Sequence, residues 1–384
     1  MINKRLSRNR ELFIIIFVVN WFIIMVKRIA IIISNADFIF AKNVGATFGG
    51  AAVVAKNIYE TLRNDFCCDV HIYSKIASSG YDQDNVFKIT EPIAKFVSSL
   101  QSMSYDKIIT LSINSVYINQ FLQVMSKHNS VRNSKFLIRL ILKFLYRKKL
   151  NYQTSVYTNL PENASFIAVS ELVKADYIKS FGIPESKVKV IYPGCSVKDK
   201  DKVSGITSGV IRLGIVANSS INKGGHFFLL AAGLAKLFGA KFEIVMIATK
   251  YNKDILMRFL ISIFSMNSIV KVLPKQNDMC DFYNGIDCIV LPSQNEAFGL
   301  VALEGMSYGK IPLVSNTTGV SEIVTDNTGY VFERNNIITL VKAISKIARM
   351  YSENQEKFRE MSNASYELSS NYTWKSFCER LLSE

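Results

Sequence analysis

The same succession of elements opens twice in this chain, and this repetition is the strongest constraint on its fold. Residues 28–34 have the sequence RIAIIIS, a short β-branched run typical of a buried parallel strand. A glycine-containing loop follows, and then a helical pattern over 51–63. The order recurs with a strand pattern at 211–217, a loop containing Lys223-Gly224-Gly225 and a helical pattern at 226–238. Strand, glycine loop and helix open a nucleotide-binding half-fold, so the sequence predicts an α/β fold with two similar domains.

Further strands and helices alternate along both halves. Strands are expected at 69–73, 107–111, 166–169, 189–192, 241–247, 269–273, 288–291 and 312–315, and helices at 252–265, 336–351 and 354–384. The charged, serine-rich stretch 195–209 suits a linker. We therefore predict domains at 27–198 and 199–365, and a C-terminal helix at 366–384 that packs back towards the first domain.

Composition narrows the class of protein and of partner. A length of 384 residues fits two domains of ordinary size. Lysine and arginine number 46 against 31 acids, a net charge of +15 that favours an acidic partner. Charge alone does not choose among nucleic acid, an anionic membrane and phosphorylated small molecules. The six cysteines form no CxxC pair and no pattern with the three histidines, so no metal site is expected.

The first 26 residues contain an apolar run at 12–26 between basic flanks. Its fifteen residues span only about 22 Å as a helix, less than a bilayer core. No small-residue cleavage site follows, which argues against a removed signal peptide. Three interpretations of 1–26 stay open: a short membrane anchor, a helix lying on the membrane or on the protein, and an extension upstream of a domain that begins near Met25.

The segment 132–149 is rich in basic residues. Arg139, Lys143 and Arg147 recur at four-residue spacing, and apolar residues occupy the other face. This pattern predicts a basic amphipathic helix. Such a helix either packs its apolar face on the sheet or contacts anionic lipid headgroups, and both interpretations stay open.

The stretch 291–305 (LPSQNEAFGLVALEG) holds the main chemical signal. A strand ends in Pro-Ser, a polar loop carries Glu296, and a helix opens at Phe298-Gly299 and contains Glu304. A helix N-terminus beyond a parallel strand is an anion site, and Gly299 lets a phosphate approach the backbone. Glu304 lies about 7.5 Å further along the helix, about one sugar unit from a diphosphate. Two carboxylates that flank a phosphate site predict the recognition of sugar hydroxyls.

The pattern Glu-x-Phe-Gly-x-x-x-x-Glu after Pro-Ser resembles the two-glutamate signature of retaining GT-B glycosyltransferases of family four. The blocks that surround it are similar to that family as well, at 167–171, 190–194, 282–287, 319–324, 328–331 and 372–374. The resemblance covers most of 27–384 and is strongest over 280–332. It implies two Rossmann-like domains that face each other across a cleft, an acceptor domain first and a sugar-nucleotide domain second.

The resemblance also implies roles for individual residues. Glu296 contacts the donor sugar and Lys223 binds the diphosphate, and these two are the expected catalytic residues. A lysine stabilises the charge that grows on a departing diphosphate. Donor binding is expected from Glu304, Phe298, Gly299, Leu300, Gly49, Gly50 and Asn218. The donor is a UDP- or GDP-sugar, and neither a cofactor nor a metal is expected.

Two positions depart from the family pattern. Asn218 stands where the family usually has an arginine five residues before the Lys-Gly pair, so part of the leaving-group stabilisation is weaker or comes from elsewhere. The family's usual histidine in the first domain has no secure counterpart, since Ser112, Asn114 and His128 are all candidates. His226 is expected to be structural. Glu322 stays open between a helix-start acid and a site residue.

The predicted function is the transfer of a hexose-type sugar to a glycan or lipid-linked acceptor, in bacterial polysaccharide synthesis such as lipopolysaccharide or capsule. The predicted location is cytoplasmic, peripheral on the inner face of the plasma membrane. Partners are the nucleotide sugar, the acceptor and an anionic membrane surface, without nucleic acid. A sugar-nucleotide epimerase and a non-catalytic basic membrane-binding protein remain alternatives. The spacing of Gly45, Gly49 and Gly50 disfavours a GxGxxG oxidoreductase.

Overall fold

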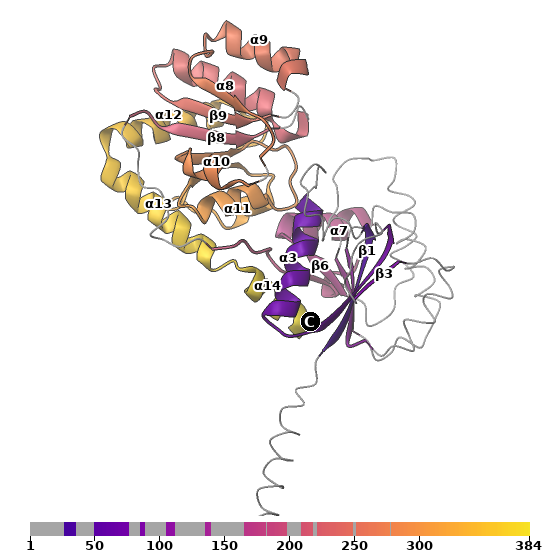
Figure 1. The fold of residues 1–384 in the computed structure, drawn as a ribbon. Helices are drawn as coiled ribbons and strands as arrows, with labels where there is room; N and C mark the ends of the chain where they lie inside the picture. Colours follow the sequence, from indigo (N-terminus) through magenta and orange to yellow (C-terminus); the bar gives the residue numbers. More distant parts are fainter. Residues whose placement is uncertain are drawn as a thin grey trace, which may run out of the picture.

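The structure of the protein is a computed structural model, and it describes eleven ranges of residues. These are 27–35, 50–76, 85–88, 105–111, 135–139, 165–181, 183–197, 209–217, 221–248, 251–276 and 278–384. They form two α/β units, each built on a parallel sheet, and the last helices of the chain lead from the second unit back to the first (Figure 1). The predicted α/β class is confirmed.

The first sheet has seven strands within the described residues, in the order β3-β2-β1-β4-β5-β6-β7, and its pairings are parallel. Its strands are β1 (Arg28–Asn35), β2 (Asp69–Ile76), β3 (Val86–Lys88), β4 (Lys107–Leu111), β5 (Lys135–Arg139), β6 (Ser165–Ala168) and β7 (Val188–Val190). Ile29, Ala30 and Ile31 of β1 are buried in succession. Both faces of this central strand are therefore covered, as its continuous apolar sequence predicts.

Helices and one 3-10 turn accompany this sheet. They are α3 (Gly50–Asn64), α7 (Glu171–Phe181) and η3 (Glu185–Lys187). Val54, Ile58 and Leu62 recur at helical spacing on α3 and are buried in one cluster with β1 and β2. This periodic apolar face fixes α3 against the sheet.

The second sheet has six described strands in the order β10-β9-β8-β11-β12-β13, again parallel. Its strands are β8 (Arg212–Val216), β9 (Glu243–Ile247), β10 (Val270–Leu273), β11 (Cys288–Leu291), β12 (Ile311–Ser315) and β13 (Tyr330–Phe332). Its helices are η5 (Ile221–Lys223), α8 (Gly225–Leu237), η6 (Tyr251–Lys253), α9 (Ile255–Ile263), α10 (Cys280–Asn284), α11 (Leu300–Met306), η7 (Gly319–Glu322), α12 (Ile337–Glu353) and α13 (Gln355–Ser370). In both sheets the order reverses beside the first strand, which is the doubly wound topology.

The expected single helix at 354–384 is two helices. α13 stays with the second unit, where Ser365 donates to the carbonyl of Lys310. The chain then breaks before α14 (Trp374–Ser383), because Thr373 and Ser376 form a capping box that begins a new helix. α14 packs on α3 of the first unit, and Figure 1 shows the chain crossing between the two units at this point.

The prediction of an amphipathic helix at 132–149 is wrong for the part of this segment that the structure describes. Residues 135–139 form β5, which pairs with β4 and β6. The run Phe136-Leu137-Ile138 is apolar without interruption, and so short a run is compatible with a buried strand as well as with a helix. Pairing with two neighbouring strands decides for the strand. The remainder of 132–149 lies outside the described residues.

No helix within the described ranges has the length and apolar character needed to cross a membrane. The apolar run at 12–26 lies outside those ranges, so its three interpretations stay predictions.

Candidate functional site

The candidate site lies where the strand order of the second sheet reverses. β8 and β11 are neighbours there, although two strands separate them in the chain. The loop after β8 contains Lys223, and the loop after β11 contains Glu296. Ligands of doubly wound sheets bind at this reversal, outside the carboxyl ends of the strands. Topology alone thus brings the two predicted catalytic residues to one place.

Close backbone contacts join the two loops. Gly224 has a φ of +66°, and a Cβ atom there would lie 2.0 Å from the carbonyl oxygen of Pro292. The amide of Gln294 donates to the carbonyl of Asn222 at 2.8 Å. Only glycine has both the backbone freedom and the small size that this contact demands. The Lys-Gly pair therefore fixes the loop after β8 against the end of β11.

Lys223 and Glu296 form an ion pair at the mouth of these loops. Nζ of Lys223 donates to Oε2 of Glu296 at 2.5 Å, and both side chains are partly exposed. The backbone of Glu296 is held as well, since its amide donates to Thr317 and its carbonyl accepts from Gly319. A fixed carboxylate thus positions an ammonium group in a partly open site, where a charged ligand can reach it.

The turn that begins α11 depends on Gly299. Its φ is +106°, and an added Cβ would lie 2.5 Å from Leu291. The side chain of Phe298 is buried and its ring contacts the ring of Tyr192. The backbone carbonyl of Phe298 accepts from the amide of Val320 at 2.7 Å. Its side chain therefore belongs to the core, and only backbone atoms at this position can meet a ligand. Leu300, the first residue of α11, is half-buried.

Glu304 is oriented by a buried tyrosine. The hydroxyl of Tyr283, in α10, donates to Oε2 of Glu304 at 2.8 Å and lies 3.2 Å from the carbonyl of Val301. Burial and the nearby Glu304 carboxylate raise the pKa of Tyr283 well above its ordinary value. The tyrosine consequently remains a donor at physiological pH, and the second glutamate of the motif has a fixed orientation.

The first unit meets this region through the start of α7. The carboxylate of Glu322 accepts from the amides of Glu171 and Leu172, each at 2.8 Å. Ser170 donates to the carbonyl of Ala297 at 2.8 Å. Glu322 thus satisfies two of the amides that a helix start leaves unpaired, and it does so across the two units.

A pocket of about 210 Å³ opens between the two units beside these contacts. From α7 it is lined by residues that include Leu172, Asp176 and Lys179, and from the second unit by Asn295, Glu296 and Thr317. Glu296 therefore borders a hollow that both units build. This arrangement can hold a small molecule between a charged loop and a mostly apolar helix face.

Sequence reasoning gave no role to Tyr283 or Ser170 and left Glu322 open between two interpretations. All three lie inside the blocks that resemble the glycosyltransferase family. Their position in those blocks was the one signal in the sequence that could have pointed to these residues. The residues that they contact are distant in sequence, so the contacts follow only from the fold.

Several predicted residues carry no structural test. Asn218 and Gly49 lie outside the described residues, as do Ser112, Asn114 and His128. Gly50 is the first residue of α3.

His226 contacts Asp254 at 2.9 Å through Nε2, and Asp254 also accepts from the amide of Met257 at the start of α9. The histidine therefore supports a helix cap. Among the described residues, no three His, Cys, Asp or Glu side chains gather in a group that suits a metal ion.

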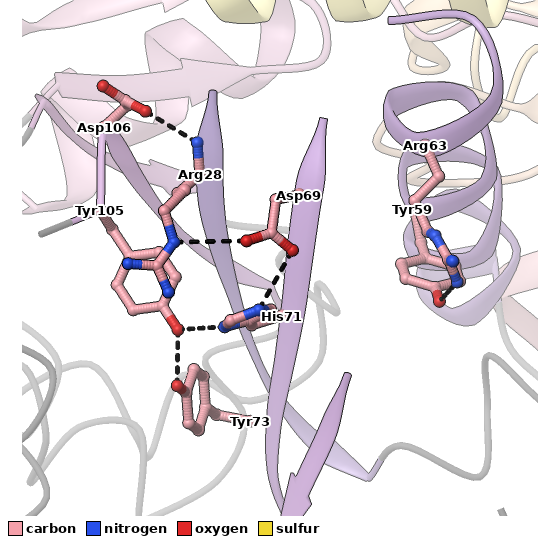
Figure 2. A network of polar contacts seen from close by, with 8 residues as sticks. All are labelled: Arg28, Tyr59, Arg63, Asp69, His71, Tyr73, Tyr105 and Asp106. Atoms are coloured by element: carbon pink, nitrogen blue, oxygen red, sulfur yellow. Dashed lines mark hydrogen bonds and ion pairs between the residues drawn. The ribbon is translucent and has the colours of Figure 1, made fainter. Parts of the chain in front are cut away.

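A second polar network extends from the amino ends of β1, β2 and β4 to the middle of β2 (Figure 2). His71 contacts Asp69 at 3.1 Å and Tyr105 at 2.5 Å, while Tyr73 lies 2.6 Å from Tyr105. Arg28 joins the network through its Nε, which lies 3.3 Å from Oδ2 of Asp69. Burial raises the pKa of Tyr105, which keeps its hydroxyl protonated. Because the members of this network bond to one another, we assign it to the stability of the first unit.

Two doubly wound sheets, with a charged site at the reversal point of the second, fit the GT-B fold, which the glycosyltransferase structures described below share. Residues 198–367 match the model of the family described as "Glycosyl transferases group 1". The match confirms the resemblance to a glycosyltransferase that was drawn from the two-glutamate motif.

Known proteins agree with this match. The glycogen synthase of Thermodesulfovibrio yellowstonii is 40% identical over 80 residues, which are 21% of this chain and 16% of the synthase. The chain thus matches about a sixth of that relative's length.

Two solved structures share the fold over nearly the whole chain. Anabaena HepE, crystallised with UDP and glucose, has a TM-score of 0.69 at 16% identity, and the alignment covers 93% of this chain and 98% of the HepE chain. The lipopolysaccharide outer core galactosyltransferase WaaB, in its apo form, has a TM-score of 0.68 at 16% identity, with coverages of 92% and 98%. At these identities the likeness concerns the fold alone.

Proposed function

We propose that this protein is a retaining glycosyltransferase that moves a hexose-type sugar from a UDP- or GDP-sugar to a glycan or lipid-linked acceptor. The observation that carries the proposal is the Lys223–Glu296 ion pair at the strand reversal, with Glu304 oriented on the neighbouring helix. The match of 198–367 to the glycosyltransferase family model supports a glycosyltransferase, and the UDP and glucose named with HepE support a nucleotide-sugar donor.

The chemistry follows from these groups. The acceptor hydroxyl oxygen attacks the anomeric carbon on the face from which the diphosphate leaves. The new C–O bond forms as the bond to the diphosphate oxygen breaks, and the hydroxyl proton passes to that departing oxygen. Lys223 stabilises the charge that grows on the diphosphate, and Glu296 then turns to the hydroxyls of the donor sugar. Glu304 accepts from the ribose hydroxyls. A fixed lysine and backbone amides supply the positive charge, so we expect no metal requirement.

The proposed setting is the synthesis of a bacterial cell-surface polysaccharide, on the inner face of the plasma membrane. The name of WaaB, which acts in the lipopolysaccharide outer core, supports a cell-surface acceptor. The excess of basic residues suits both an anionic nucleotide sugar and an anionic membrane.

A thermal-shift screen of the full chain with UDP- and GDP-sugars tests donor binding first, because a ligand that binds the folded state raises the melting temperature. The donor that stabilises the protein then enters a donor-hydrolysis and sugar-transfer assay. We expect Lys223→Ala to lower kcat by a factor of about 100 or more, as loss of one stabilising group at a leaving oxygen does elsewhere. Glu304→Gln is expected to raise KM for the donor mainly.

Exposed residues of α13 provide matched controls. Lys357→Ala and Glu356→Gln make the same chemical changes on the surface of the second unit and are expected to leave both constants unchanged. Wild-type rates in both Lys223→Ala and Glu304→Gln would exclude this site as the place of transfer.

A further inference from the structure

Helix α9 is apolar around most of its circumference although one side of it faces solvent. Seven of its nine residues are apolar. Met257 and Ile261 are buried in the core of the second unit. The opposite side has exposed fractions from 51% to 80%, at Ile255, Leu256, Phe259 and Ile263. A helix that is hydrophobic on all sides is normally covered on all sides, so this exposed side is an unexplained surface.

The exposed surface continues onto the end of α8. The two helices run side by side in the same direction, since Met257 lies against Gly225 at their starts and Phe264 against Gly233 near their ends. Beyond this contact, Leu237 and Phe238 are 68% and 78% exposed. We call these two residues together with Ile255, Leu256, Phe259 and Ile263 the α9 patch. Figure 1 shows α9 on the outer side of the second unit, away from the first.

The stretch of chain that contains the α9 patch is mostly basic, and Arg258 of α9 is itself exposed. In the sequence, residues 225–276 contain seven lysines and arginines and only two acids. Asp254 is one of the acids, and it is already bonded to His226 and to the start of α9. Glu243, the other, lies at the start of β9. Lys236 donates to the carbonyls of Phe264 and Ser265 at the end of α9.

An exposed apolar helix face with basic surroundings matches the chemistry of an anionic bilayer, where apolar side chains enter the boundary of the acyl chains and lysines meet lipid phosphates. A second copy of the chain fits less well, because a symmetric contact through α9 would bring like charges together.

We propose that the α9 patch is a membrane-contacting surface that binds an anionic lipid bilayer. This surface is separate from the cleft, and it extends the proposed function by assigning membrane contact to the sugar-nucleotide domain. Binding to lipid through the patch does not require the donor site, so the two proposals can fail independently.

Sedimentation of the full chain with vesicles tests the proposal. One set contains phosphatidylcholine with phosphatidylglycerol, and the other contains phosphatidylcholine alone. We expect the partition coefficient to be at least about tenfold larger for the anionic set, because each lysine or arginine near the surface contributes about 1 kcal/mol. The double variant Phe259→Ser and Ile263→Ser is expected to lower binding to anionic vesicles by about tenfold or more, because two apolar side chains no longer insert.

Ile338→Ser is the matched control. Ile338 is 61% exposed on α12, outside the α9 patch, and its loss is expected to leave vesicle binding unchanged. The melting temperature and its shift with nucleotide sugar report on the fold and the donor site of each variant. Unaltered vesicle binding by the double variant would overturn the proposal, and so would equal binding to both vesicle sets. Sedimentation velocity gives a third contrary outcome, in which the wild type dimerises, the double variant is monomeric and neither binds lipid.

Discussion

At the scale of single residues, the glycines beside the candidate site set the positions of its charged groups. Gly224 combines a left-handed backbone with contact to the carbonyl of Pro292. We expect Gly224→Ala to lower the free energy of unfolding by more than about 1 kcal/mol and to displace Lys223. Donor affinity should fall together with stability, and urea unfolding and nucleotide-sugar titration measure the two effects.

The variant Gly239→Ala distinguishes the effect of a left-handed backbone from the effect of a steric clash. Its φ of +89° is also left-handed, but an added Cβ would meet nothing within 4 Å. Gly239→Ala should therefore show only the conformational penalty, about 1 kcal/mol, and leave donor affinity unchanged. Equal losses in the two variants would mean that the contact with Pro292 has no role at the site.

Lys310 predicts a pH dependence of stability. Burial lowers its pKa from 10.5 to about 8, although the carboxylate of Asp287 acts in the opposite direction. Between these two pKa values the unfolded chain binds more protons than the folded chain, so the free energy of unfolding rises with pH from about 8 to 10.5. Lys310→Met should reduce this slope, by at most about 1.4 kcal/mol per pH unit.

Urea unfolding at several values between about pH 8 and 9.5 measures the slope below the range in which tyrosines titrate. Lys357→Met changes an exposed lysine and is expected to keep the wild-type slope. A slope in Lys310→Met that equals the wild-type slope would show that the buried ammonium does not govern stability in this window.

At the scale of elements, the start of α7 is a joint between the two units. Its first amides donate to Glu322, which belongs to η7 of the second unit. We expect Glu322→Ala to lower the free energy of unfolding by about 1–2 kcal/mol, the usual effect of losing a helix cap. The two units should also move apart, which small-angle scattering detects as a larger radius of gyration.

Two further variants distinguish the cap from the charge. Glu322→Gln keeps an oxygen that accepts one of the amides, so its loss of stability should be smaller. Glu356→Ala removes an acid from the first turn of α13, within one unit, and should leave the radius of gyration unchanged. A radius in Glu322→Ala equal to that of the wild type would contradict a role in joining the units.

The same scale shows what the sequence could predict. Continuous apolar runs such as 28–34 and 288–291 predicted strands correctly, because buried parallel strands leave no polar face. The run at 136–138 was ambiguous, since pairing with β4 and β6 comes from residues far away in the chain. Lys223 and Glu296 were chosen from their motifs, and their proximity follows from the order of β8 and β11. The contact of Tyr283 with Glu304 had no sequence signal of its own.

At the scale of the whole molecule, the C-terminal helix belongs to the unit that is remote in sequence. α14 buries Trp374, Phe377 and Leu381 in one cluster with α3. Lys107, at the start of β4, is buried, and its ammonium donates to the carbonyls of Leu381 and Leu382 at 2.6 Å each. A cation at a helix C-terminus satisfies the last carbonyls and opposes the helix dipole. The end of the chain therefore ties the first unit to the second.

We expect Lys107→Met to loosen this connection. The buried carbonyl of Leu381 and the partly buried carbonyl of Leu382 lose a charged donor, which corresponds to about 1–3 kcal/mol of local stability. Hydrogen exchange should accelerate in α14 and α3, whereas α12, which lies wholly in the second unit, should keep its protection. Lys189→Met is the matched control, because it removes an exposed ion pair with Glu384 at 3.4 Å, and such pairs contribute little. If exchange accelerated equally in α14 and α12, the lysine would act on global stability, and the chain end would not be a separable link between the units.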